Sequence, residues 1–267
     1  MNEVAEKVRT NGIASKDNWL STIDEEKARK IIATLKPTKS DKQSWCSINY
    51  KSHLIKLIKL DFKTLSRSFF FINLAKKLNL KEIAEEIFQR KAKLYGIDFY
   101  YNSRSEDPVL DWHCDTAYSG KKNVEKFIHP NNYSIKFFFY LTDVSKDNGC
   151  LSYIPGSNRI TYAIKKGIFE GDLKYTPYWS LKDFRKTVQI KNNYNYIKKI
   201  VGENTLSEFL ERTNFVENQG SENYSFDHEI KKGGAIIFDE TGIHRGSRIR
   251  FNDRIALRFF YKQIDYT

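Results

Sequence analysis

The first 92 residues carry apolar residues at the three- and four-residue spacing of helices. Thr22 and Glu25 have the spacing of a capping box, in which the hydroxyl and the carboxylate each bind a free backbone N–H at the start of a helix. This helix is predicted to run to about Leu35, because Pro37 cannot continue it. Residues 1–92 are therefore predicted to form a mainly helical N-terminal part.

The rest of this part is predicted to contain a loop and two further helical segments. Residues 41–50 are predicted to form the loop. Residues 51–63 alternate lysines with leucine and isoleucine, which fits a basic amphipathic helix on a membrane or partner. It also fits a core helix whose lysine stems lie along its edges, and we favour this second interpretation. Residues 68–92 are predicted to be helical, most clearly over 80–88.

After Gly96 the pattern changes to short apolar and aromatic segments that are typical of strands. Residues 134–141 are nearly all apolar, so this strand is predicted to be covered on both faces. Residues 147–149 (Asp-Asn-Gly) predict a tight turn, since Asn-Gly readily takes positive φ. The predicted strands cover residues 97–101, 134–141, 150–154, 224–230, 235–238, 243–249 and 254–264.

Residues 158–222 interrupt these strands and show little periodicity apart from a helix predicted near residues 206–212. We interpret them as an insertion whose aromatic residues, such as Tyr175, Tyr178 and Trp179, either line a pocket or pack within a lid. Helices first and many short strands afterwards predict an α+β fold with a β-sandwich or barrel core.

Composition narrows the class of protein. A chain of 267 residues can bury one good-sized core, and 40% hydrophobic residues argue against disorder. No apolar run approaches the roughly 20 residues that a membrane-spanning helix needs. The N-terminus lacks the apolar segment of a secretory signal. The three cysteines (Cys46, Cys114 and Cys150) show no C-x-x-C spacing, so reduced thiols and a cytoplasmic location are predicted.

The formal net charge of +12 suggests an anionic partner. The lysines, however, are scattered through every segment and are interleaved with acidic residues. This distribution does not favour nucleic-acid binding. A basic surface that attracts an anionic small substrate is at least as well supported.

His113 and Asp115 are the strongest candidates for chemistry. In an extended segment residues i and i+2 point to the same side, so both can reach one metal ion while Cys114 points away. With His244 as a third ligand, two imidazoles and one carboxylate leave three metal positions open, which suits non-haem Fe(II). The alternative is that His113 is a hydrogen-bonded core histidine and Asp115 a turn residue.

Arg254 follows on the next predicted strand, where its planar guanidinium is placed to bind a carboxylate. Arg258 lies on the same face of that strand and is the alternative. Arg254 could also be a surface residue on a strand edge. The remaining histidines have no partner at ligand spacing and receive no role; they are His53, His129 and His228.

Several short motifs occur in one order along the chain. They are Trp112-His113-Cys114-Asp115, Leu141-Thr142-Asp143-Val144, Asn148-Gly149-Cys150-Leu151, Ile154-Pro155-Gly156-Ser157, His244-Arg245-Gly246-Ser247 and Arg254-Ile255-Ala256-Leu257. In this order they resemble the phytanoyl-CoA dioxygenase (PhyH) family of Fe(II)/2-oxoglutarate oxygenases. The matching pieces lie in residues 95–160 and 230–262.

The resemblance implies one dioxygenase domain over residues 1–267. Its core would be a double-stranded β-helix, or jelly roll, formed by residues 93–157 and 223–267. The helices of residues 1–92 would pack on this core, and residues 158–222 would be an insertion or lid.

The resemblance also implies the roles of the site residues. Iron would be held by His113, Asp115 and His244, and Arg254 would bind the distal carboxylate of 2-oxoglutarate. The other end of 2-oxoglutarate would chelate the iron, and O2 would take the last position. Further contacts to 2-oxoglutarate are expected from Ser247, Tyr100 and Asn102. Two features depart from the family: the His244–Arg254 spacing is one residue shorter, and Arg245 is larger than expected.

The expected reaction is hydroxylation of an unactivated C–H bond of a small or carrier-bound metabolite, with release of succinate and CO2. Because Asp115 is present, the site resembles that of the hydroxylating members and not of the halogenating ones. Two other functions stay open at this point. One is a non-catalytic protein that binds a small molecule or an anionic partner on the same fold, and the other is a nucleic-acid-modifying oxygenase. The sequence carries no signal for an oligomeric state.

Overall fold

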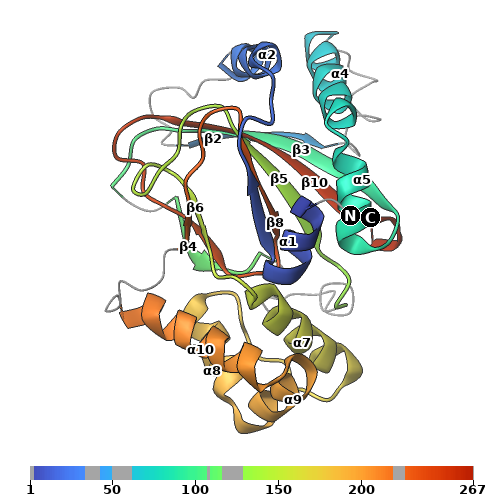
Figure 1. Ribbon diagram of the computed structural model, residues 1–267, viewed down its shortest axis with the longest axis vertical. Helices are drawn as coiled ribbons and strands as arrows, with labels where there is room; N and C mark the ends of the chain where they lie inside the picture. Colours follow the sequence, from blue (N-terminus) through green and yellow to red (C-terminus); the bar gives the residue numbers. More distant parts are fainter. Residues whose placement is uncertain are drawn as a thin grey trace.

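Two antiparallel sheets form the centre of the molecule, and helices cover them from outside (Figure 1). The computed structural model describes residues 3–33, 43–49, 62–106, 109–115, 129–218 and 226–266. The larger sheet has the order β1 (Ile13–Lys16), β8 (Ala235–Asp239), β5 (Ser134–Tyr140), β10 (Arg254–Gln263), β3 (Ala92–Asn102) and β2 (Gln43–Asn49). The smaller sheet has the order β4 (Leu110–His113), β9 (His244–Gly246), β6 (Leu151–Tyr153) and β7 (Asp227–His228).

Strand β5 shows how the larger sheet separates two cores. All its residues are buried, as the nearly continuous apolar run predicts. On one face Phe137 and Phe139 pack into a core with the N-terminal helices. On the other face Phe138 and Tyr140 pack into the interior between the sheets. The α+β fold with a jelly-roll core, predicted from the sequence, is confirmed.

The outer face of the larger sheet is covered by the N-terminal helices (Figure 1). These are α1 (Glu3–Asn11), α2 (Thr22–Ala33), α4 (Phe62–Lys77) and α5 (Leu80–Phe88). Among the described helices, none is long and apolar enough to cross a membrane.

Within the predicted insertion 158–222, the described residues 158–218 are far more regular than expected. They contribute most of a helical unit that lies together at one end of the molecule (Figure 1). Its helices are α7 (Ser157–Glu170), α8 (Leu181–Gln189), α9 (Lys191–Val201) and α10 (Glu203–Asn218). The helix predicted near 206–212 lies within α10. Helices α7, α8 and α9 were not predicted, because they mix apolar anchors with many lysine and other polar residues.

The N-terminal part also differs from the expectation in its strands. Residues 41–50 were expected to be a loop, but Gln43–Asn49 forms β2, which pairs along β3. Ile13–Lys16 forms β1, which pairs with β8 at the opposite edge of the sheet. Both strands are polar in part and gain their hydrogen bonds only from distant partners, so local periodicity does not reveal them.

The helix boundaries shift by small amounts. Ser21, and not Thr22, caps α2, since its hydroxyl accepts a hydrogen bond from the backbone N–H of Asp24 at 3.2 Å. The block expected over 68–92 is divided into α4 and α5 at Asn79, which has a positive φ of 53°. The expected helix over 51–63 and the expected end of α2 near Leu35 lie largely outside the described residues.

Candidate metal centre

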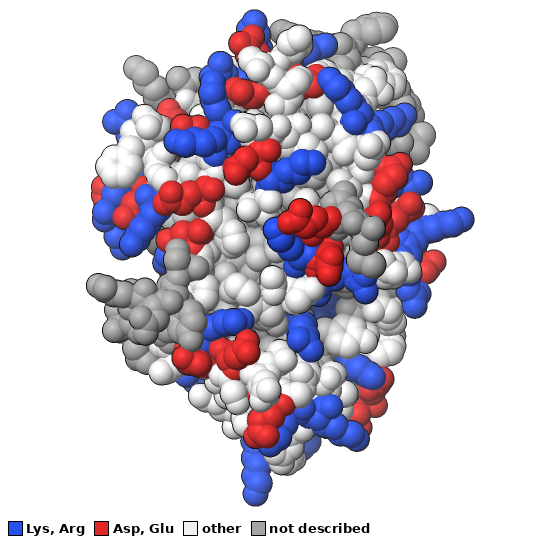
Figure 2. All heavy atoms as spheres, in the orientation of Figure 1, with Lys and Arg blue, Asp and Glu red and all other residues white. Residues whose placement is uncertain are grey.

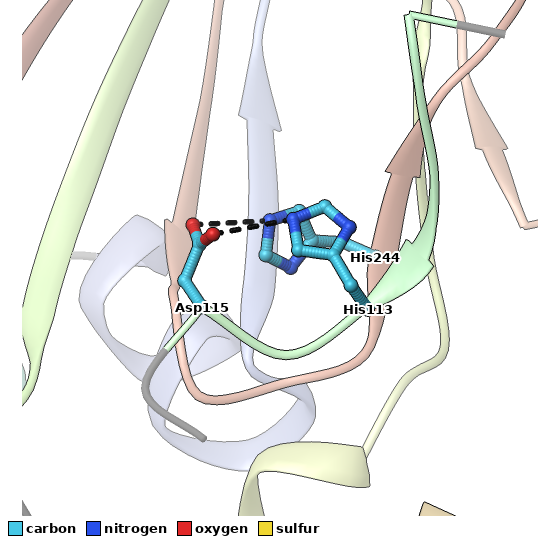
Figure 3. A group of neighbouring side chains, drawn as sticks. All are labelled: His113, Asp115 and His244. Atoms are coloured by element: carbon cyan, nitrogen blue, oxygen red, sulfur yellow. Dashed lines mark ion pairs between the residues drawn. The ribbon is translucent and has the colours of Figure 1, made fainter. Parts of the chain in front are cut away.

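His113 and His244 meet because their strands pair. His113 ends β4 and His244 begins β9, and the two residues are direct partners in the antiparallel register. Their ring centroids are 4.4 Å apart. Asp115, two residues after His113, completes the group (Figure 3): its Oδ1 lies 3.2 Å from His113 Nε2 and its Oδ2 lies 3.4 Å from His244 Nε2. The three ligand atoms lie within 4.8 Å of one another.

Each imidazole is oriented by a backbone carbonyl. Nδ1 of His113 lies 2.6 Å from the carbonyl oxygen of Asp111, and Nδ1 of His244 lies 2.9 Å from that of Gly242. Because a carbonyl oxygen only accepts, Nδ1 carries the proton of each neutral ring, and Nε2 keeps a free lone pair. Both lone pairs face Asp115, which is the donor arrangement that a divalent metal requires.

The ionisation of the group also suits a cation. Burial opposes the charge of Asp115, but the positive charge of the Lys136 ammonium acts against burial, and the pKa of the carboxyl lies well below its usual range. Burial lowers the pKa of His244, although Asp115 acts against this. The carboxylate is therefore ionised and His244 neutral at pH 7, as metal ligands must be.

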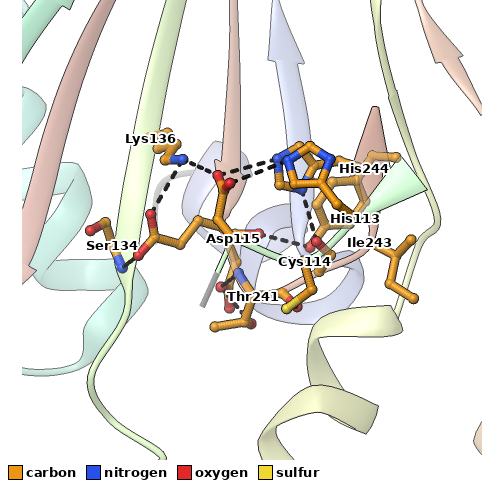
Figure 4. A network of polar contacts seen from close by, with 12 residues as sticks. His113, Cys114, Asp115, Ser134, Lys136, Thr241, Ile243 and His244 are labelled. Carbon is orange, nitrogen blue, oxygen red and sulfur yellow. Dashed lines mark hydrogen bonds and ion pairs between the residues drawn. The ribbon is translucent and has the colours of Figure 1, made fainter. Parts of the chain in front are cut away.

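Cys114 lies between two of these residues but points away from them (Figure 4). Its Sγ donates to the carbonyl oxygen of Thr241 at 3.1 Å, and the side chain is part of the core of the helical unit. This is the orientation expected from the alternation of an extended segment. The backbone N–H of Cys114 donates to the carbonyl oxygen of Trp179 at 3.0 Å, so the loop before α8 is bonded directly to the segment that carries His113 and Asp115.

The two candidate arginines line the same cavity as the histidines and differ in their partners. The cavity has a volume of about 530 Å³. Arg258 forms a two-pronged ion pair with Asp98, at 2.8 and 2.7 Å, and also donates to the Tyr100 hydroxyl. Arg254 instead donates to the Asn102 side chain at 3.1 Å and to the carbonyl oxygen of Gly149 at 2.9 Å. Among the described residues, Arg254 has no carboxylate partner.

The three weaker candidates lie in different places. Tyr100 lines the cavity and bonds to Arg258. Asn102 holds Arg254 Nε, so it orients that guanidinium. Ser247 is buried, and its hydroxyl lies 3.5 Å from the Cys150 thiol.

Two residues that were not predicted as site residues, Lys136 and Glu240, also line the cavity. Lys136 is the one charged residue in the otherwise apolar or small-residue run of β5, and its place on the same face as Phe138 was the available signal. Glu240 directly follows β8. Of the histidines without a predicted role, His129 packs edge-on against the ring of Phe169, and His53 lies outside the described residues.

The model of one protein family, phytanoyl-CoA dioxygenase (PhyH), matches residues 56–254. The chain belongs to this family. The resemblance noted from the sequence is thereby confirmed, and so is the enzyme class: a PhyH protein depends on iron, 2-oxoglutarate and O2. A search of curated proteins found no match.

Solved structures show the same fold at low sequence identity. HygX from Streptomyces hygroscopicus, with nickel and 2-oxoglutarate bound, is 14% identical with a TM-score of 0.58 over 99% of this chain and 87% of that one. The epimerase SnoN, in complex with Fe3+, alpha ketoglutarate and nogalamycin RO, is 11% identical with a TM-score of 0.53 over 97% and 82%. The carbocyclase SnoK from nogalamycin biosynthesis is 11% identical with a TM-score of 0.54 over 98% and 84%.

Proposed function

We propose that this PhyH protein hydroxylates an unactivated C–H bond of a small or carrier-bound metabolite. In this proposal His113, Asp115 and His244 hold Fe(II), and Arg254 binds 2-oxoglutarate. The observation that carries it is the convergence of the three ligand atoms within 4.8 Å in a cavity that also holds a buried guanidinium without a carboxylate partner among the described residues. When bound, iron, 2-oxoglutarate and O2 supply the oxidant for the C–H bond and release succinate and CO2.

Arg254 is the better anchor for 2-oxoglutarate because its charge is not yet balanced. Burial lowers the pKa of Arg254, which marks a desolvated cation. Burial also opposes the charge of Arg258, but Asp98 outweighs it and raises the pKa of that side chain. A carboxylate beside Arg254 would balance the buried charge, and the N–H groups that remain after the bonds to Asn102 and Gly149 can donate to it.

The helical unit supports a small-molecule substrate. Tyr178 is fully buried in its core, whereas Trp179 is 43% exposed and its ring centroid lies 5.4 Å from that of His113. We assign Trp179, and through it the helical unit, to substrate contact. Solved structures of this fold hold hygromycin B and nogalamycin RO, which supports a small organic molecule as the substrate class.

The face of the molecule shown in Figure 2 does not favour a nucleic acid. On the face shown in Figure 2, lysine and arginine side chains are interleaved with aspartate and glutamate. A nucleic-acid-modifying oxygenase would need a continuous basic surface along the phosphate backbone.

Anaerobic titration with Fe(II) and 2-oxoglutarate tests the proposal, with the visible charge-transfer band of the chelate as the readout. We expect the band in the wild type and none in His113→Ala. In Arg254→Ala we expect the band to need much more 2-oxoglutarate. His129→Ala, which removes a histidine outside the group, is the matched control and should behave like the wild type. A folded wild-type protein that gives no band would refute the proposal.

A further inference from the structure

Lys136 is a cation in the metal cavity to which the proposed function gives no role. It lies on the inward face of β5 and is 4% exposed. Its ammonium lies over the rings of Phe238 and Phe260, which are its register neighbours on the two flanking strands. The side chain is therefore fixed from three strands, and its charged end reaches the triad.

The ammonium of Lys136 joins two carboxylates. It donates to Oδ2 of Asp115 (Figure 4), and it lies 3.3 Å from Oε2 of Glu240. Glu240 is itself held at β5: its Oε1 accepts the backbone N–H of Ser134 at 2.7 Å, and its own N–H donates to the Ser134 carbonyl oxygen at 3.2 Å. Lys136 thus connects strand β5 to the side chain of Asp115 through a hydrogen bond.

Asp115 is the least enclosed member of the triad. Its side chain is 30% exposed, against 3% for His113 and 6% for His244. Each histidine has a backbone carbonyl that fixes its orientation. Lys136 is the corresponding partner of Asp115, since partners outside the ligand set commonly orient metal ligands.

A lysine beside a divalent ion also opposes metal binding through its charge. The Glu240 carboxylate balances that charge at 3.3 Å. The pair as a whole is neutral, so it can support Asp115 without expelling the ion.

We propose that Lys136, held by Glu240, is a positioning residue that keeps Asp115 a ligand through one oxygen only. The inference rests on the proposed metal site. Its chemical consequence follows from the six positions of an octahedral metal. A one-oxygen carboxylate leaves three positions, two for 2-oxoglutarate and one for O2. A carboxylate that binds through both oxygens would leave two, and 2-oxoglutarate would fill them.

The test counts water on a bound Mn(II) probe by water-proton relaxation, without substrate or turnover. The variants are Lys136→Met, and the double variant Lys136→Met with Glu240→Gln, which keeps the charge balanced if the single variant does not fold. Lys165→Met is the matched control. Lys165 is also a buried lysine, but its ammonium donates to the carbonyl oxygen of Asn132 and not to the triad.

We expect the relaxivity per bound Mn(II) to fall by about one third in the Lys136 variants, as one of three open positions is lost. The control should match the wild type. Complete loss of Mn(II) binding in the folded double variant would also support the role, because it would show that Asp115 needs its partner. Wild-type relaxivity per ion in both Lys136 variants would overturn it. A folded wild-type protein that binds no Mn(II) would instead refute the metal site itself.

Discussion

Two arginines on one face of β10 differ in a single partner residue, and this partner determines whether the guanidinium is already ion-paired. Arg254 and Arg258 have the same chemistry and line the same cavity. Asp98, on the neighbouring strand β3, lies opposite Arg258 in the register and pairs with it through both oxygens. Arg258 is thereby part of the wall, while Arg254 keeps N–H groups available for a ligand.

Replacement of Arg258 by Met should lower the free energy of unfolding by about 3–5 kcal/mol, because it removes the two-pronged ion pair of the buried Asp98 carboxylate. Urea unfolding measures the change. Asp98→Asn added to Arg258→Met should recover most of the stability, since the double variant removes both charges of the buried ion pair. The affinity for 2-oxoglutarate should change far less than in Arg254→Met. A stable Arg258→Met protein that no longer binds 2-oxoglutarate would make Arg258 the anchor.

The sequence alone was enough to identify the three residues of the candidate triad. It could not show which of the two arginines has a carboxylate partner. The i, i+2 spacing and the family resemblance sufficed to name His113, Asp115 and His244, which the structure brings together; their role as iron ligands stays a prediction. The pairing of Asp98 with Arg258, by contrast, spans 160 positions along the chain. The same holds for Lys136 and Glu240, whose meeting depends on the register of β5 with β8.

Among the elements, the helices of the helical unit were predicted least well from the local spacing of apolar residues. Leu181, Phe184 and Val188 do have helical spacing in α8, but the helix has only 9 residues and four of them are charged. Its stability comes from packing within the unit's shared core, which no single segment reveals. Strand β2 was missed for the related reason that its hydrogen bonds come from β3.

Helix α7 contains a buried lysine, Lys165, that should lower the stability of the folded protein. Burial lowers the pKa of Lys165 to about 8 from its ordinary value of 10.5. The unfolded chain therefore binds the proton more tightly than the folded one, and stability falls as pH falls from about 10.5 to 8. Lys165→Met should raise the free energy of unfolding at pH 7 by about 2 kcal/mol, after the lost hydrogen bond to Asn132 is deducted.

Urea unfolding of both proteins at pH 7 and pH 10 checks this. The difference in the free energy of unfolding between wild type and Lys165→Met should be smaller at pH 10. At that pH Lys165 is neutral in the folded wild type, so burial no longer opposes a charge. An equal difference at both pH values would show that the ammonium of Lys165 is adequately solvated.

In the molecule as a whole, the cavity lies between the two sheets and is lined by residues of both. The histidines come from β4 and β9 of the smaller sheet, whereas Arg254 and Lys136 come from β10 and β5 of the larger one. A metal and 2-oxoglutarate bound there would therefore join the sheets as well as serve the chemistry.

Metal and 2-oxoglutarate should accordingly raise the melting temperature. A ligand at about a hundredfold excess over its Kd stabilises the folded state by about 2.7 kcal/mol. For a chain of this size that corresponds to about 5–10 °C. Differential scanning fluorimetry with Mn(II) and 2-oxoglutarate measures it, and a chelator should reverse it. His244→Ala should show no metal-dependent shift; an equal shift in that variant would place the bound metal elsewhere.

The hydrogen bond from the Cys114 N–H to the Trp179 carbonyl oxygen has a mechanical consequence. An isolated bridge between His113 and Ser180 continues it, so the loop before α8 acts as a short extra strand beside the ligand-bearing segment. In the proposed function, a substrate that displaces the exposed ring of Trp179 would also displace this loop. The loop is bonded to the backbone beside His113, so such a displacement would change the position of a proposed metal ligand.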